Sequence, residues 1–230
     1  LDLLKDFNQM RLRNGAENSR LEGLIESYEL AFKMQTSVPS TIDITNEPKQ
    51  VLEKYGVNEG STSKFGRQCL LAKKFVEAGV RFVEIGHGGW DMHQNINDNL
   101  KKQATAIDKP MGGLIQDLKD CGLFEDTIIL FGSEFGRTPG MKQGATGRDH
   151  NNGGFSMWMA GGGVKGGMRH GSTDDFGHKA IPEYSMDMHD LHATILHLMG
   201  VDHTKLTYRY SGRDFRLTDV FGNIQYDIIS

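Results

Sequence analysis

Carboxylates and imidazoles gather in three short glycine-flanked stretches, and these are the residues best suited to chemistry. Asp91 and His93 stand two positions apart after a run of glycines, Glu134 follows an apolar run, and Asp149 and His150 are adjacent. An ionised carboxylate and a neutral imidazole are suitable ligands for a divalent ion such as zinc or manganese. The sequence therefore predicts a metal site built from Asp91, His93, Glu134, Asp149 and His150.

Each of these signals has a simpler interpretation when it is taken alone. A carboxylate beside a histidine in a loop is commonly a turn residue next to a surface imidazole. The metal interpretation depends on the three stretches meeting in space. Other histidines, among them the helical pair His189 and His192, fit a helix surface or a hydrogen-bonded core position, while His87 and His178 are reserve ligands in loops.

Arg137 and Arg148 accompany the same stretches and are candidates for holding an anionic substrate. A guanidinium is a planar fork that matches the oxygens of phosphate or sulfate, but an ordinary ion pair with nearby carboxylates explains these arginines equally well. Trp90 is a candidate stacking surface for a substrate ring, or a packing anchor in its loop. No G-x-S-x-G pattern is present, and although Ser133 and Thr138 carry hydroxyls, the catalytic residue stays unknown.

The segments around these residues predict an α/β arrangement with parallel strands. An apolar run at residues 80–85 precedes the first stretch, and another at 127–131 precedes Glu134. Between them, residues 98–121 have the three- and four-residue apolar spacing of a helix. A strand, helix and strand in this order make a crossover whose strands run parallel and end at one sheet edge. Open α/β sheets bind ligands at that edge, so the connectivity places Glu134 near Asp91 and His93.

The remaining apolar patterns predict further helices and strands. Helices are expected at residues 1–34, 49–55, 63–78 and 187–199, and strands at 155–160 and 224–229. Leu24, Tyr28 and Phe32 mark one apolar face of the first helix. Residues 35–62 are polar and contain prolines, which predicts a flexible connection. A chain of 230 residues is long enough for its own core, and we expect a single α/β domain over residues 1–230.

Charge and hydropathy argue against two classes of protein. The net charge of −4 does not suit a general nucleic-acid binder, which usually carries a basic patch. No apolar run is long enough to span a bilayer. The two cysteines form neither a metal-binding nor a disulfide-rich pattern. A small-molecule or glycan ester substrate is expected only from the family resemblance described next, and the oligomeric state is left open.

Several of these motifs occur together, and in the same order, in one bacterial protein family. Residues 88–93 (GGWDMH), 134–139 (EFGRTP) and 147–150 (GRDH) resemble its successive motifs, as do residues 190–196 and the tail at 206–219. From Ser63 onward the chain resembles the sulfatase-like domain-of-unknown-function family 1501, which is usually placed in the alkaline phosphatase superfamily.

This resemblance implies a three-layer α/β sandwich with a mostly parallel central sheet. It also implies a site of one or two divalent metals, in which Asp91, His93 and His150 resemble the ligands of one metal. Glu134 and Phe135 stand where the second metal takes an aspartate and a histidine, and phenylalanine cannot ligate. The superfamily's first strand and nucleophile are expected upstream of residue 1, which makes the chain the C-terminal portion of a longer domain. Export from the cytoplasm is a further expectation from the resemblance.

The sequence thus favours a metal-dependent hydrolase of phosphate or sulfate esters, with zinc, calcium, manganese or magnesium as the metal. A fragment of such an enzyme could keep the fold and lack activity. The alternative is a non-catalytic module that binds sulfated or phosphorylated glycans on a degenerate hydrolase fold. Phe135 at a ligand position and the missing nucleophile favour that alternative.

Overall fold

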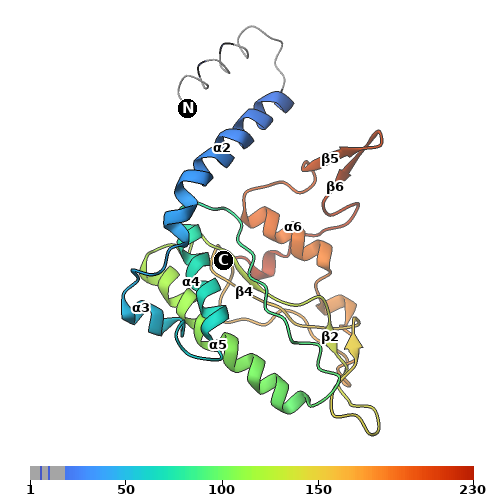
Figure 1. Ribbon diagram of the computed structural model, residues 1–230. Helices are drawn as coiled ribbons and strands as arrows, with labels where there is room; N and C mark the ends of the chain where they lie inside the picture. The colour runs from blue at the N-terminus through green and yellow to red at the C-terminus, as the bar shows by residue number, and fades with distance from the viewer. Residues whose placement is uncertain (1–5, 7–9, 11–18) are drawn as a thin grey trace.

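The structure is a computed structural model that describes residues 6, 10 and 19–230, and the rest of the predicted first helix lies outside these residues. Three helices within residues 49–120 pack together on one side, and a later helix and the short strand pairs lie beside them (Figure 1). The helices are α2 (Ser19–Ile42), α3 (Lys49–Lys54), α4 (Ser63–Glu77), α5 (Ile96–Asp120) and α6 (Met188–Leu198). The strands are β1 (Ile129–Phe131), β2 (Gly136–Arg137), β3 (His150–Asn151), β4 (Trp158–Ala160), β5 (Thr207–Tyr210) and β6 (Arg213–Arg216).

Helices α4 and α5 lie where the apolar spacing predicts them. Each ends at a glycine with positive φ, Gly79 at 85° and Gly122 at 73°, a conformation that glycine adopts without the steric cost of a Cβ. Helix α5 is continuous through Pro110, which is fully buried. Periodic burial of one face therefore sets both helices, because packing outweighs the local cost of the proline.

The core lies between α3, α4 and α5. Tyr55, Leu70 and Ile107 are buried in one cluster, and Ile85 and Trp90 pack against its edge. Burial of apolar surface of this kind is the main stabilising term in a small domain. Since Ile85 and Trp90 lie just before Asp91 in the chain, the same core supports the segment that carries the first two predicted ligands.

The predicted parallel sheet is wrong. β1 pairs antiparallel with β4, and every sheet in the described residues has two strands. Residues 80–85 were predicted as a strand, but they form none and pair with no strand among the described residues. The three-layer sandwich with a mostly parallel central sheet is therefore replaced by helices and short antiparallel pairs. Ile85 contacts the helical core, whereas Phe82 in the same run is 78% exposed. An apolar run therefore does not identify a pairing partner.

The C-terminal tail also differs from the prediction. Residues 224–229 form no strand; a 3-10 turn at Tyr226–Ile228 buries Ile228 there, and Ile229 makes a single bridge to Val164. Strands β5 and β6 instead form a hairpin that the apolar pattern did not predict. Its two connecting residues, Ser211 and Gly212, both have positive φ, at 47° and 83°, as type I′ hairpin turns require.

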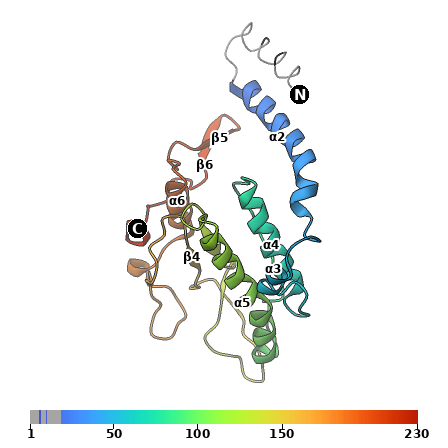
Figure 2. The ribbon, with the colours of Figure 1, turned by 90° about the vertical axis from the view of Figure 1, so that its left-hand side faces the viewer.

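Helix α2 projects from the rest of the molecule in both views (Figures 1 and 2). It contacts α4 and ends at Ile42, so the connection predicted at residues 35–62 begins later than expected. Leu24, Tyr28 and Phe32 are exposed, and the predicted packing face of this helix is not covered by the described chain. None of the described helices is both long and apolar enough to cross a membrane.

Candidate metal centre

Asp91 and His93 lie on one segment, and the burial of the residue between them directs both outward. Met92 is 5% exposed, whereas Asp91 and His93 are both exposed. Successive side chains of a non-helical, extended segment point to opposite sides, so an inward Met92 turns both neighbours toward solvent. Trp90 anchors the same segment, since its Nε1 donates a hydrogen bond to the His87 carbonyl at 3.0 Å.

His150 reaches this segment through the ladder between β2 and β3. The two strands are antiparallel, with Arg137 directly opposite His150. The Arg148 amide donates a hydrogen bond to the Met92 carbonyl at 3.1 Å. This bond joins the segment that carries His150 to the one that carries Asp91 and His93.

Gly147 allows the two segments to approach so closely. A Cβ on this residue would lie 2.2 Å from the carbonyl carbon of His93 and 2.3 Å from the carbonyl oxygen of Met92. No side-chain atom fits at such distances, because both neighbours are backbone atoms that cannot rotate away. The glycine of the G-R-D-H motif is therefore a packing requirement of the candidate site.

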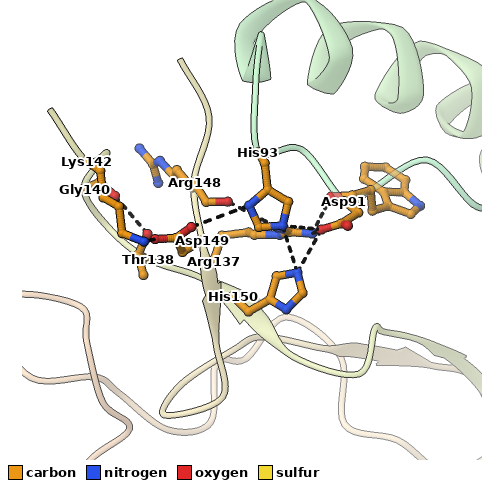
Figure 3. A network of polar contacts seen from close by, with 10 residues as sticks. Asp91, His93, Arg137, Thr138, Gly140, Lys142, Arg148, Asp149 and His150 are labelled. Atoms are coloured by element: carbon orange, nitrogen blue, oxygen red, sulfur yellow. Dashed lines mark hydrogen bonds and ion pairs between the residues drawn. The ribbon is translucent and has the colours of Figure 1, made fainter. Parts of the chain in front are cut away.

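Three ligand atoms meet at this junction, from Asp91, His93 and His150 (Figure 3). Asp91 Oδ1 lies 3.0 Å from His93 Nε2 and 2.8 Å from His150 Nε2. The two Nε2 atoms are 3.2 Å apart. Two ligands that each lie about 2.1 Å from one ion are about 3 Å apart in octahedral coordination and about 3.4 Å apart in the tetrahedral coordination of zinc. The spacing and the donor types of this triad therefore fit a divalent metal ion.

The carboxylate of the triad is ionised at any ordinary pH. Hydrogen bonds from His150 and then from Arg137 lower the pKa of Asp91 to about 2. The side chains of Asp91, His93 and His150 are 67%, 46% and 48% exposed. Water and a small ligand can therefore reach the triad directly.

Asp149, a predicted metal ligand, lies behind His93 and outside the group of three. Its Oδ1 is 3.5 Å from His93 Nδ1, and its Oδ2 is 2.5 Å from Lys142 Nζ. The contact with Lys142 holds the pKa of Asp149 below its usual value, with a smaller contribution from His93. An imidazole that ligates through Nε2 carries its proton on Nδ1, where a carboxylate can fix the tautomer. Asp149 occupies that supporting position.

Glu134, the remaining predicted ligand, is not in the group that the described residues form. Its expected approach depended on parallel pairing between residues 80–85 and 127–131, which does not occur. Phe135 next to it packs on the imidazole of His150, with ring centroids 4.2 Å apart. Phe135, which by the resemblance stands at a second-metal position, thus supports the imidazole of His150.

The residues predicted to bind substrate differ in how the structure uses them. Arg137 Nη1 donates to the Arg148 carbonyl at 3.2 Å, and its Nη2 donates to the Trp90 carbonyl at 2.9 Å and to Asp91 Oδ1 at 2.8 Å. The Arg148 side chain points away from the imidazoles, on the side of Lys142 (Figure 3). Trp90 is half-buried against the core. Contact of these three residues with a substrate stays a prediction.

Two features of the site were not singled out from the sequence. Lys142 is a lone lysine in a polar loop, which no sequence pattern singles out, and Gly147 was noted only as the first residue of the G-R-D-H motif, without a packing role. The hydroxyls considered as nucleophiles are engaged locally: Ser133 donates to the Phe135 carbonyl at 2.9 Å and Thr138 to the Gly140 carbonyl at 2.8 Å. Neither hydroxyl is paired with a basic side chain in these contacts.

Comparison with known protein families places the chain in one of them. The sequence fits the family described as "Protein of unknown function (DUF1501)" over residues 1–229. No curated protein and no solved structure matches it. The resemblance to family 1501 is thereby confirmed and extends over nearly the whole chain, whereas placement in the alkaline phosphatase superfamily receives no support.

Proposed function

The chain belongs to the DUF1501 family, and from the site that its fold assembles we propose a divalent-metal-dependent hydrolase of phosphate or sulfate esters. The metal would be held by Asp91, His93 and His150. The observation that carries this proposal is the convergence of three ligand atoms, no more than 3.2 Å apart, from residues as far as 59 positions apart in sequence.

The donor set favours some metals over others. Two imidazole nitrogens and one carboxylate suit zinc or manganese, whereas calcium and magnesium prefer oxygen ligands. A divalent ion supplies a Lewis acid for the ester and lowers the pKa of water. Asp149 would hold the Nδ1 proton of His93 and so keep Nε2 free for ligation. Lys142 and Arg148 place positive charge on one side of the triad, which favours an anionic substrate.

A second candidate is a non-catalytic module that binds sulfated or phosphorylated glycans. It is favoured by the hydroxyls of Ser133 and Thr138, which donate to backbone carbonyls. A serine or threonine nucleophile is ordinarily activated by an adjacent base. In this reading the triad and the nearby cations would hold an anionic group without transferring it.

Calorimetric titration of the metal-free protein with ZnCl₂ and MnCl₂ tests the metal site. We expect one ion per chain, loss of binding in Asp91→Asn and His150→Ala, and wild-type binding in Asp175→Asn. Asp175 is an exposed aspartate outside the triad, so its variant controls for the loss of one negative charge. Wild-type stoichiometry in Asp91→Asn would remove this residue from the site and refute the proposal.

Turnover separates the two candidates. The protein is assayed with p-nitrophenyl phosphate and p-nitrophenyl sulfate, with and without EDTA. Chelator-sensitive hydrolysis of either ester supports the hydrolase. Metal binding without turnover, together with retention on a sulfated glycan such as heparin, supports the binding module.

A further inference from the structure

Arg137 joins the two segments that carry the triad, through both its backbone and its side chain. Its backbone lies opposite His150 in the β2–β3 ladder. Its guanidinium donates to the carbonyls of Trp90 and Arg148 and to Asp91 Oδ1, at 2.9, 3.2 and 2.8 Å. One side chain thus contacts the segment of Asp91 and the segment of His150 at the same time.

The position of this side chain fits a supporting role. The Arg137 side chain is 20% exposed, compared with 67% for Asp91. It reaches from β2 toward Asp91 beside the imidazoles (Figure 3). The guanidinium already donates three hydrogen bonds to protein atoms. It therefore has few donors left for an outside ligand.

We propose that Arg137 is a positioning residue that holds Asp91 and His150 at ligating distance before any metal arrives. This inference rests on the proposed metal site. A guanidinium is a rigid planar fork, so simultaneous bonds to three acceptors fix their relative positions. A lysine at this position offers one ammonium at the end of a flexible chain and cannot reproduce that geometry.

The sign of the effect on metal affinity separates positioning from plain electrostatics. A fixed positive charge beside a cation site repels the cation. If Arg137 acted only through its charge, its removal would therefore tighten metal binding. If Arg137 acts by holding the segments together, its removal weakens metal binding although the repulsion is gone.

The test compares Arg137→Gln, Arg137→Lys and the control Arg169→Gln by titration with ZnCl₂, well below each melting temperature. Arg169 is an exposed arginine in a distant stretch of the chain. Loss of an outer-shell partner weakens metal binding by about 10–100-fold, and we expect this for Arg137→Gln, a loss also for Arg137→Lys, and no change for Arg169→Gln. Unchanged or tighter binding by Arg137→Gln overturns the inference, as does a lowered melting temperature with wild-type affinity.

Hydrogen exchange of the metal-free proteins gives a second readout that does not need the ion. The Arg148 amide donates to the Met92 carbonyl across the two segments, so its protection reports whether they stay together. We expect this amide to exchange about tenfold faster or more in Arg137→Gln. If the wild-type protein binds no ion, the proposed function fails, but the exchange rates still test whether Arg137 holds the two segments together. Equal protection of the Arg148 amide in Arg137→Gln and in the wild type refutes that role of Arg137.

Discussion

Replacing Gly147 by alanine should separate the two segments of the candidate metal centre. The added Cβ would lie 2.2 Å from the carbonyl carbon of His93 and 2.4 Å from the amide nitrogen of Gln94. Ordinary van der Waals contact begins at 3.4 Å, so the backbones must part by about 1 Å. That movement exceeds the roughly 0.5 Å within which the groups of a functional site must be held.

The cost of this substitution has two parts. Overpacking against backbone typically destabilises by about 1–3 kcal/mol. The hydrogen bond from the Arg148 amide to the Met92 carbonyl, 3.1 Å long, would be stretched and lost, which adds about 1 kcal/mol. We therefore expect Gly147→Ala to lower the free energy of unfolding by about 2–4 kcal/mol. Metal affinity should fall by at least about 10–100-fold, since a ligand moves out of reach.

Urea unfolding and zinc titration measure the two effects, and the chain provides a matched control. Gly140 lies in the same loop, has no positive φ, and a Cβ there would have nothing within 4 Å. Gly140→Ala should therefore match wild type in both measurements. Wild-type stability and affinity in Gly147→Ala would refute the close approach of the two segments, and with it the geometry of the triad.

Two further predictions concern the helical core. Tyr55 is fully buried and donates to Asp117 Oδ2 at 2.9 Å, so Tyr55→Phe should cost about 1.5–3 kcal/mol in urea unfolding, as hydrogen bonds to charged groups do; a loss under about 0.5 kcal/mol would contradict this. Burial raises the pKa of Cys69 to about 12, while Cys121 is exposed, so at about pH 8 a thiol reagent should modify Cys121 alone in the folded protein and both thiols in urea. Equal rates for the two cysteines in the folded protein would show that the core is open.

The helices could be predicted from the sequence because each has a long periodic pattern. In α4 the buried residues Phe65, Cys69 and Ala72 recur every three or four positions, and no other regular structure explains that spacing. Strand pairing was not predictable in the same way. The run at 80–85 is apolar enough for a strand, but its partner depends on the tertiary arrangement. Strands β5 and β6 contain no buried residue, and the one local signal of their hairpin is the Ser211-Gly212 turn.

The candidate site was partly predictable for a similar reason. Asp91, His93 and His150 belong to residue types with few roles other than ligation, catalysis or surface charge, and they occur in glycine-flanked loops. The contribution of Arg137 could not be deduced, because two of its three acceptors are backbone carbonyls, which any residue type provides. Asp149 was predicted as a metal ligand, but it lies against His93 Nδ1 and outside the group of three, because sequence does not distinguish a ligand from a residue that holds a ligand.

The shortness of β2 and β3 affects the order in which parts of the molecule unfold. Each strand has two residues, and only these strands and a few hydrogen bonds in loops position the triad. The main cluster of buried apolar side chains lies among α3, α4 and α5. Elements with few buried contacts open at lower free energy than the global unfolding transition. We expect the ligand-bearing loops to melt as a separate unit while the helices stay folded. A bound ion would then stabilise that unit and raise its free energy of local unfolding toward that of the helices.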